Sequence, residues 1–427
     1  MNFVEELRWR GLLHDIMPGT EEELLKGMAA GYIGFDPTAD SLHVGSLLQI
    51  FTLVRFQNAG HKPFALVGGA TGMVGDPSGK SQERNLLSED ILSKNLKGIQ
   101  SQLERFLNFD CGANSAEIVN NYDWFKNYSF LDFIRDAGKH ITVNYMMSKD
   151  SVKKRLESEV GMSFTEFSYQ LIQGYDFYYL WKHKNCVLQM GGSDQWGNIV
   201  TGTEFIRRKD GGQAFALTSP LIKKSDGTKF GKSEGGNVWL DANKTSPYQF
   251  YQFWLNASDE DAENYIKIFT FFNQQEIESL VATHLEAPHQ RVLQKSLAKD
   301  ITERVHGEEA LETALKTTDF LFGNGSLDFL KSFNDEGVLT VFEGITQFTI
   351  AQVEFASGYD ALTLLADKTS IFSSKGEAKK MITGGGVSIN REKIPNPEKS
   401  FTQTDLINGK FLVVQKGKKN YFLVIVE

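Results

Sequence analysis

Threonine, histidine and glycine residues stand at the start of an expected helix, where they could bind a polyphosphate. The strand-like run Tyr32 to Phe35 breaks at Asp36-Pro37-Thr38, and His43-Val44-Gly45-Ser46 opens the apolar stretch from Leu47. Backbone N–H groups of a first helical turn lack intrahelical partners, and the helix dipole is positive there. His43 and Thr38 add side-chain donors. A histidine here is more often a capping residue, so the segment predicts a nucleotide site only in combination with other residues.

A glycine-rich cationic loop offers a second set of phosphate donors. The stretch from Pro220 to Gly236 contains two close glycine groups and several lysines, among them Lys229 and Lys232. These lysines could close over a polyphosphate and neutralise charge that develops on a leaving group. The alternative is a solvated linker between domains.

Three expected strands end in turns that carry glycine together with a polar side chain. Besides the run to Phe35, they are Lys62 to Val67, followed by a glycine-rich turn to Asp76, and Cys186 to Met190, followed by Gly191-Gly192-Ser193-Asp194-Gln195. Ligands bind beyond the carboxyl ends of parallel strands, so these turns would share one crevice. Such turns also end strands for local reasons, but three of them favour a common site in a doubly wound α/β domain.

Between the second and third of these strands, residues 121–184 are expected to be mostly helical. Tyr169, Gln173 and Asp176 follow one another there at steps of four and three, so they lie on one helix face. A polar face is usually solvated. Aromatic and apolar neighbours such as Phe167 and Leu171 favour a pocket wall instead.

The composition describes a globular protein of several domains that we expect in the cytoplasm. The chain has 427 residues, 41% of them hydrophobic, which is too long for one ordinary core. Cys111 and Cys186 are too few for a disulfide framework or a structural zinc site. No apolar run reaches the roughly 18 residues of a membrane span, and the first residues lack a signal pattern.

The charge is unevenly distributed along the chain. The whole chain carries −9, whereas residues 370–427 hold ten Lys and Arg against five Asp and Glu, a local charge of +5. A helical pattern begins at Ser246-Pro247 and loosens at Gly323-Asn324-Gly325 and near Gly344. A basic module at the end of an acidic chain suggests a polyanionic partner.

Together these segments resemble the class I aminoacyl-tRNA synthetases, and specifically the bacterial-type tyrosyl-tRNA synthetases. His43-Val44-Gly45-Ser46 matches the HIGH signature, and Lys229-Phe230-Gly231-Lys232-Ser233 matches the KMSKS signature. Either short motif could occur by chance. Both stand in the family's order, separated by the helix of Tyr169, Gln173 and Asp176, and the resemblance covers nearly the whole chain.

The resemblance implies a two-step reaction on a Rossmann-like domain. Tyrosine and ATP, with Mg²⁺ accompanying the ATP, give tyrosyl-adenylate and pyrophosphate, and the tyrosyl group then passes to the terminal ribose of tRNA-Tyr. The substrate carboxylate is itself the nucleophile, so catalysis would come from positioning and electrostatic stabilisation. The implied catalytic donors are Thr38, His43, Lys229 and Lys232.

The resemblance also assigns substrate-binding residues and no metal ligands. Tyrosine would be bound at its phenol by Tyr32 and Asp176, at its ammonium group by Asp76, Tyr169 and Gln173, and at its carboxyl group by Gln195. A buried carboxylate that accepts the phenolic hydroxyl would be unpaired if phenylalanine bound. The implied ATP-binding residues are Gly34, Asp36, His43, Gly45, Ser46, Gly192, Asp194, Lys229, Phe230 and Lys232.

The family pattern predicts the domain organisation and the partners. The predicted catalytic domain covers 1–222 and contains a helical insertion over about 121–184. A mobile loop over 223–240 leads to a helical domain over 241–325 that reads the anticodon region. A linker over 326–354 then connects to a C-terminal RNA-binding domain over 355–427. The insertion around Phe164 implies a homodimer, and the basic module implies salt-sensitive tRNA binding.

Two positions depart from the family, and several rival functions stay open. Ser46 replaces a histidine or asparagine of many relatives and has no ring to pack against a nucleotide, and Ile33 lacks a polar side chain that some relatives use near the ribose. A tryptophanyl-tRNA synthetase shares both signatures, although Asp176 with Tyr32 favours a hydroxyl-bearing ring. A non-catalytic RNA-binding protein with the same fold and a stand-alone nucleotidyltransferase are two further rival functions.

Overall fold

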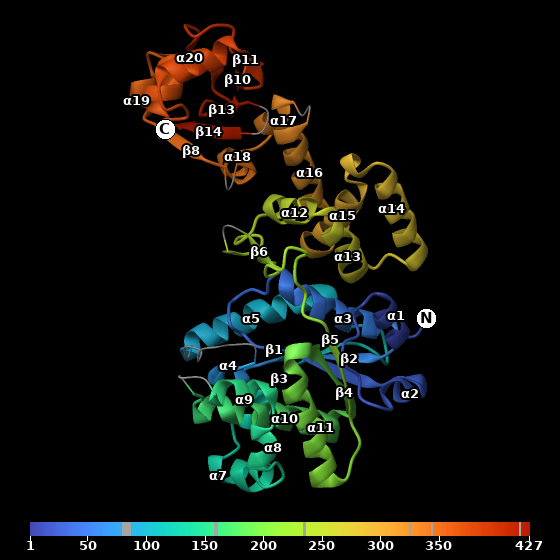
Figure 1. The fold of residues 1–427 in the computed structure, drawn as a ribbon. Coiled ribbons are helices and arrows are strands. Elements are labelled where there is room, and N and C mark those ends of the chain that lie inside the picture. The colour runs from blue at the N-terminus through green and yellow to red at the C-terminus, as the bar shows by residue number, and fades with distance from the viewer. Residues whose placement is uncertain (79–86, 158–160, 234–235, 324–325, 343–344, 418–419) are drawn as a thin grey trace. The chain divides into compact units, whose positions relative to one another are not determined.

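The computed structural model describes residues 1–78, 87–157, 161–233, 236–323, 326–342, 345–417 and 420–427 (Figure 1). Residues Asn324, Gly325 and Gly344 of the predicted linker signals and the bases Lys418 and Lys419 lie outside these ranges. Contacts divide the chain into two units, Met1–Lys244 with Trp254–Val305, and Thr245–Phe253 with His306–Glu427. Within the described residues, no helix is both long and apolar enough to cross a membrane.

The first unit contains a five-stranded sheet whose paired strands are all parallel, as the doubly wound prediction requires. Its order is β3 (Glu117–Asn120), β2 (Lys62–Val67), β1 (Ala30–Phe35), β4 (Cys186–Gly192) and β5 (Phe215–Ser219). The chain extends the sheet from β1 first on one side and then on the other. The point between β1 and β4 is therefore the topological switch point, where open α/β sheets bind ligands.

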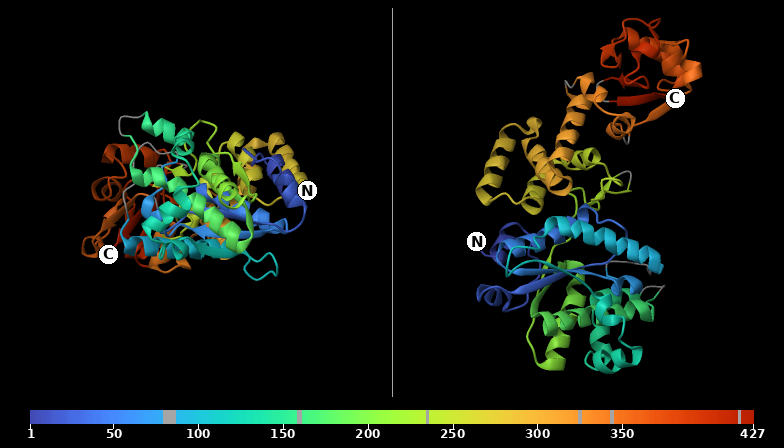
Figure 2. Two further views of the ribbon diagram at one scale, coloured as in Figure 1. Left: turned by 90° about the horizontal axis from the view of Figure 1, so that it is seen from below. Right: turned by 180° about the vertical axis from the view of Figure 1, so that it is seen from behind.

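Helices cover both faces of this sheet (Figure 2). In Figure 1, α3 (Leu47–Asn58) and α5 (Glu89–Phe106) lie above it, and α10 (Phe164–Lys184) and α11 (Trp196–Asp210) lie below it. Burial from both sides explains why five of the six residues of β2 are buried in an unbroken run.

The remaining elements of the first unit are short helices of the insertion and a helical segment after the loop. The insertion contains α6 (Tyr122–Phe125), α7 (Phe130–Phe133), the π-helical turn η2 (Ile134–Gly138), α8 (Val143–Met147) and α9 (Asp150–Leu156). The helical segment contains α13 (Asp259–Phe269), α14 (Gln274–Glu286), η4 (Pro288–Gln290) and α15 (Val292–His306). The first unit also contains α1 (Phe3–Trp9), α2 (Thr20–Leu25), α4 (Thr71–Val74) and the 3-10 turn η3 (Ser193–Gln195). Ser258 caps α13, since its hydroxyl accepts from the Asp261 N–H at 3.1 Å.

The second unit is built on a mixed sheet with a core on each side. Its order is β11 (Glu392–Lys393), β10 (Val387–Ile389), β13 (Phe411–Lys416), β14 (Asn420–Val426) and β8 (Gln347–Ile350). Successive residues of β13 point to opposite faces: Leu412 packs with α20 (Lys375–Thr383), and Val413 packs with α16 (Glu308–Phe322), α17 (Leu327–Lys331) and α18 (Asp335–Val341). Small elements complete it: α12 (Pro247–Leu255), which begins in this unit, α19 (Gln352–Phe355), β9 (Tyr359–Asp360), η5 (Thr363–Lys368), β12 (Ser400–Phe401) and η6 (Gln403–Asp405).

The stretch predicted as a linker, 326–354, contains helices and a strand. It holds α17, α18 and β8, and β8 pairs in parallel with β14. The glycines at both ends suggested a loose segment, but apolar residues between them, such as Leu330 and Val341, are buried in the core of the second unit. The other predicted domain boundaries stay predictions.

Candidate active site

The end of β1 carries a carboxylate that connects two neighbouring elements. Asp36 follows β1 and accepts hydrogen bonds from the Thr71 hydroxyl at 2.7 Å and the Tyr169 hydroxyl at 2.8 Å. Gly68 follows β2, and a Cβ atom there would lie 2.2 Å from the Asp36 carboxylate. The glycine after this strand therefore leaves the space that the carboxylate occupies.

Asp176 lies buried beneath the switch point with two fixed donors. Its side-chain oxygens accept from the Asn121 amide at 3.0 Å and the Trp124 indole N–H at 2.9 Å. The Asn121 amide is oriented, because its own oxygen accepts the Ala70 N–H at 2.6 Å. Burial raises the pKa of Asp176 to about 8, although these two hydrogen bonds act in the opposite direction.

Tyr32 supplies a buried hydroxyl beside this carboxyl group. The side chain is 1% exposed, and its ring meets Phe177 edge to face at 5.5 Å. Burial and the nearby Asp176 raise the pKa of Tyr32, so the hydroxyl stays protonated. Within the described part of the chain this hydroxyl has no hydrogen-bond partner. A buried orphan hydroxyl next to a carboxyl group fits a ligand that also carries a hydroxyl.

A second polar group lies around Asp76, where β2 and β4 lead into their turns. Asp76 accepts from the Gln195 amide at 2.6 Å and from the Ser78 N–H at 2.9 Å. The Gln173 side-chain oxygen is buried and lacks a partner among the described residues. A carboxylate with acceptor oxygens in this setting could bind an ammonium group.

His43 caps the short helix start that the sequence predicted. The first turn is the 3-10 turn η1 (Val44–Ser46), and α3 follows it directly. The His43 Nδ1 atom accepts the Gly45 N–H at 3.0 Å, so in the neutral ring the proton is on Nε2, which is a donor. A Cβ atom at Gly45 would lie 2.7 Å from the His43 ring, which explains the glycine. The capping reading of His43 is thus correct, and the cap fixes the orientation of the ring.

The base of the cationic loop is hydrogen-bonded to this helix start. The Val44 N–H donates to Val238 at 2.9 Å, and the Leu240 N–H donates to Leu42 at 2.9 Å. Gly231, at φ +82°, packs against the Val44 side chain in a conformation that favours glycine. The loop continues as β6 (Lys232–Ser233) and β7 (Gly236–Asn237). The two signature segments are therefore neighbours although about 190 residues separate them.

The remaining predicted ATP-binding residues lie on these strand ends and on the loop. Gly34, Thr38, Asp194, Lys229 and Lys232 are exposed, and Gly192 is the last residue of β4. The ring of Phe230 instead packs against Phe269 at 5.2 Å and Tyr265 at 5.1 Å. Any contact of Phe230 with a nucleotide would therefore come from its backbone.

Three polar residues of the site were missed from the sequence. Asn121 and Trp124 bind Asp176, and Gln189 on β4 pairs in register with Tyr32, so both side chains point to the same face of the sheet. The Gln189 side-chain oxygen is buried and unpartnered among the described residues. A glutamine inside the apolar run Cys186–Met190 was a usable signal. Asn121 and Trp124 gave none, because only the fold brings them to Asp176.

A cavity of about 900 Å³ opens beside the end of β4. It is lined by Asp194, Trp196 and the cationic side chains of Lys149 and Lys154. Burial lowers the pKa of Lys149 to about 8. Among the described residues, no group of three or more His, Cys, Asp or Glu side chains is arranged to hold a metal ion.

Comparison with known families agrees with the fold. Residues 26–323 match the family described as tRNA synthetases class I (W and Y), and residues 340–424 match the tyrosine–tRNA ligase SYY-like C-terminal domain. A tryptophanyl-tRNA synthetase of Encephalitozoon cuniculi shares the fold, with a TM-score of 0.52 and 12% identity. The chain is thus a class I tRNA synthetase of the tryptophan and tyrosine group.

Whole-chain relatives narrow this class. The chain is 61% identical over 429 residues to a tyrosine–tRNA ligase of Flavobacterium johnsoniae, covering 100% of this chain and 99% of that one. It is 60% identical over 430 residues to that of Porphyromonas gingivalis, covering 100% of both. A truncated mitochondrial tyrosyl-tRNA synthetase of Aspergillus nidulans has a TM-score of 0.68 and 30% identity, covering 75% of this chain and 94% of that one. The chain belongs to the tyrosine–tRNA ligase family.

Proposed function

We propose that the chain activates L-tyrosine with ATP and transfers it to the 3′-terminal ribose of tRNA-Tyr, in the cytoplasm. The observation that carries the proposal is the buried pair of Tyr32 and Asp176 at the switch point of the sheet. A phenolic hydroxyl can donate to Asp176 and accept from Tyr32. An indole ring carries only an N–H donor, which cannot accept a hydrogen bond from Tyr32.

Tyrosine recognition divides between two polar groups. Tyr32 and Asp176 bind the phenol, and Asp76, Tyr169 and Gln173 bind the ammonium group. The distance between these groups is set by the sheet, since Tyr32 lies on β1 and Asp76 follows β2. Phenylalanine leaves the Tyr32 hydroxyl without a partner and offers Asp176 no hydrogen bond, which costs free energy that tyrosine does not lose.

Activation uses donors on both sides of the phosphates. The tyrosine carboxylate attacks the α-phosphorus of ATP, the bond to the β-phosphate oxygen breaks, and pyrophosphate leaves with the added negative charge. Thr38 and the His43 Nε2–H donate from the helix start, and Lys229 and Lys232 donate from the loop. Gln195 orients the carboxyl group, and Asp194 binds the ribose. Charge stabilisation that exists only in the transition state raises kcat without tightening substrate binding.

ATP is expected to arrive with Mg²⁺. Magnesium usually keeps several waters and binds substrate phosphates together with few protein carboxylates. The exposed lysines of the loop, Lys229 and Lys232, supply further positive charge. The metal neutralises phosphate charge when it is bound.

The aminoacyl end of the tRNA is proposed to enter the cavity beside Asp194. Lys149 and Lys154 line it and can neutralise phosphates, and Trp196 offers a ring for base stacking. The second unit supplies further basic residues. Lys379, Lys380 and Lys393 are exposed on α20 and β11.

A homodimer is proposed through the helical insertion. Large apolar side chains are exposed there: Phe130 at 66%, Leu131 at 72%, Val143 at 59%, Met147 at 44% and Phe164 at 67%. Such exposure in one short region is typical of an association surface. A second copy of the chain is the partner that the family resemblance favours.

Charging of tRNA tests the proposal directly. The purified chain with ATP, Mg²⁺ and transfer RNA from a bacterial relative should attach tyrosine to the 3′ end of tRNA-Tyr. Charging with tryptophan instead would support a tryptophanyl-tRNA synthetase, and tRNA binding without any charging would support a non-catalytic RNA-binding protein.

A further inference from the structure

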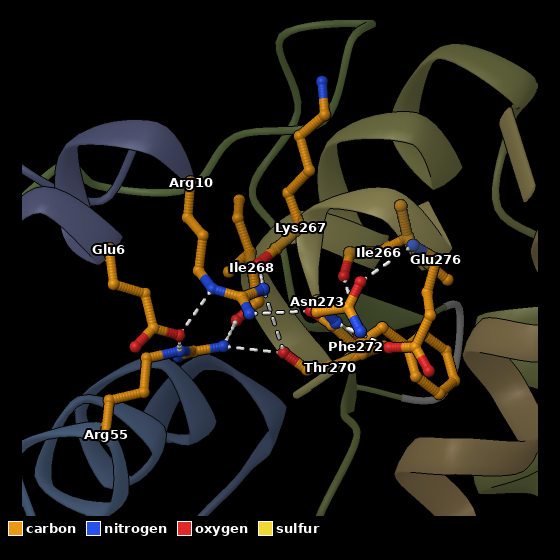
Figure 3. A network of polar contacts seen from close by, with 10 residues as sticks. All are labelled: Glu6, Arg10, Arg55, Ile266, Lys267, Ile268, Thr270, Phe272, Asn273 and Glu276. Carbon is orange, nitrogen blue, oxygen red and sulfur yellow. Dashed lines mark hydrogen bonds and ion pairs between the residues drawn. The ribbon is translucent and has the colours of Figure 1, made fainter. Parts of the chain in front are cut away.

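Two buried arginines bind the carboxyl end of α13 (Figure 3). Arg10 and Arg55 are 5% and 1% exposed, and their guanidinium groups donate to backbone oxygens at 2.8 to 3.2 Å. The acceptors are the carbonyl groups of Lys267, Ile268, Thr270 and Phe272. The last carbonyl groups of a helix lack intrahelical donors and carry partial negative charge, so cations stabilise this end. We call Arg10 and Arg55 the arginine pair.

The turn after α13 is also held through its aromatic ring. The guanidinium carbons of Arg55 and Arg304 each lie 4.8 Å from the centre of the Phe271 ring. Glu6 provides the negative charge: its carboxylate accepts from Arg10 at 2.8 Å and lies 3.5 Å from Arg55. Burial, and then the neighbouring Arg10, lower the pKa of Arg55 to about 9, which leaves it charged at neutral pH. Two charged side chains, Arg10 and Arg55, are thus buried to fix one turn, a costly arrangement unless their hydrogen bonds have good geometry.

The same helix holds the cationic loop. Phe230 stands between Lys229 and the Gly231-Lys232 pair, and its ring packs on Tyr265 and Phe269 of α13. Trp254 closes the cluster, with ring centres 5.8 Å from Phe230 and 4.9 Å from Phe269. Movement of α13 would therefore move Phe230 and the lysines beside it.

The arginine pair also reaches the other signature. Arg55 lies on α3, which begins directly after His43-Val44-Gly45-Ser46. Arg10 follows α1, and Glu6 lies on α1. Contacts therefore run from the helix that starts at the histidine motif, through α13, to the loop that carries the lysines.

We propose that Arg10 and Arg55 are positioning residues for tyrosyl-adenylate formation. Arg10 fixes the end of α13 to α1, and Arg55 fixes it to α3, so together they set the distance between the donors on the loop and the donor on His43. Misplacement by about 1 Å of groups far from the reacting atoms can cost about a hundredfold in rate. The inference rests on the transition-state role proposed for Lys229 and Lys232.

Lysine substitutions test the arginine pair because they keep the charge and lose the forked donor geometry. Arg55→Lys and Arg10→Lys should each lower kcat of ATP–pyrophosphate exchange about tenfold to a hundredfold. KM for tyrosine should stay unchanged. Arg8→Lys is the matched control, since Arg8 lies on the same helix as Glu6 and pairs with Glu21 at 2.9 Å. Unchanged kcat in folded Arg55→Lys and Arg10→Lys would overturn the inference.

A double-mutant cycle separates positioning from simple destabilisation. If the arginine pair acts through Phe230, then Arg55→Lys combined with Phe230→Leu should lose less kcat than the product of the single losses. Multiplying losses would overturn the inference. If Arg55→Lys fails to fold, Glu6→Gln replaces it in the same cycle, because the Glu6 side chain is 27% exposed. Lys232→Ala tests the proposed function separately. If Lys232→Ala loses activity but Arg10→Lys and Arg55→Lys do not, only the inference about the arginine pair is refuted and the proposed function stands.

Discussion

At the scale of single residues, the site depends on a carboxyl group whose environment makes its charge costly. Asp176 is 1% exposed, and the amide and the indole that bind it do not supply a positive charge. A phenolic hydroxyl completes its hydrogen bonding. Incomplete hydrogen bonding of the buried carboxyl group costs free energy, and a ligand with a hydroxyl group removes this cost. The site therefore prefers a hydroxylated ring.

The raised pKa of Asp176 predicts a pH dependence of stability. In the folded state the carboxyl group keeps its proton up to about pH 8, whereas in the unfolded chain it loses it near pH 4. The folded state therefore binds more protons in this window, and the free energy of unfolding should fall as pH rises from about 4 to about 8. Asp176→Asn should remove this contribution. In urea unfolding, the free energy of unfolding of the variant minus that of the wild type should therefore increase as pH rises from about 4 to about 8.

The control for this experiment is Asp123→Asn, an exposed carboxyl group that is 66% accessible and pairs with Lys126. Its unfolding free energy should follow the wild type at every pH. Parallel curves for Asp176→Asn and wild type would show that Asp176 is ionised in both states.

The assigned phosphate donors predict a loss in rate rather than in affinity. His43→Ala and Lys232→Ala should each lower the rate of adenylate formation about a hundredfold, because each removes a donor to developing charge. The dissociation constant for tyrosine, measured by equilibrium dialysis, should stay nearly unchanged. Lys223→Ala in the same loop is the control. A large loss of tyrosine binding would contradict the transition-state role.

At the scale of elements, local sequence patterns predicted the individual strands and helices of the site well. They did not predict which of these elements lie next to one another. β2 has the predicted bounds, β1 and β4 are longer than predicted by two residues each, and the His43 segment begins a helix. The order of the strands depends on long-range pairing, which no local pattern contains. For the same reason, Asn121 and Trp124 could not be assigned to Asp176, which follows them by 55 and 52 residues.

The helical insertion predicts an effect on association. Phe164→Asp places a charge on the 67% exposed first residue of α10 and should dissociate the proposed dimer in sedimentation velocity. Leu285→Asp is a matched control, since Leu285 is 69% exposed on α14, outside the insertion. A wild-type chain that sediments as a monomer, or a Phe164→Asp variant that stays dimeric, would refute this surface.

At the scale of the whole molecule, the structure leaves fewer basic side chains to contact tRNA than the net charge of the C-terminal basic module suggests. Arg391 donates to the Phe320 carbonyl group, Lys410 pairs with Asp335 at 3.3 Å, and Lys416 pairs with Glu377 at 3.1 Å. Lys379, Lys380 and Lys393 are exposed. The composition predicted the sign of the charge of this module, and the fold determines which of its lysine side chains are exposed and can contact a phosphate.

Replacing Lys379, Lys380 and Lys393 by alanine should raise KM for tRNA in the charging assay. The slope of log affinity against log salt should decrease by about one for each lost phosphate contact. ATP–pyrophosphate exchange needs no tRNA and should not change. Lys410→Ala is the control, and an unchanged KM for the triple variant would exclude this surface from tRNA binding.

The central claim is that a class I site at the switch point of the sheet selects tyrosine by its hydroxyl. The most direct measurement is ATP–pyrophosphate exchange with each of the twenty amino acids in turn. We expect exchange that depends on tyrosine, with phenylalanine and tryptophan near background. Exchange that responds to tryptophan alone, or no exchange with any amino acid, would contradict this claim.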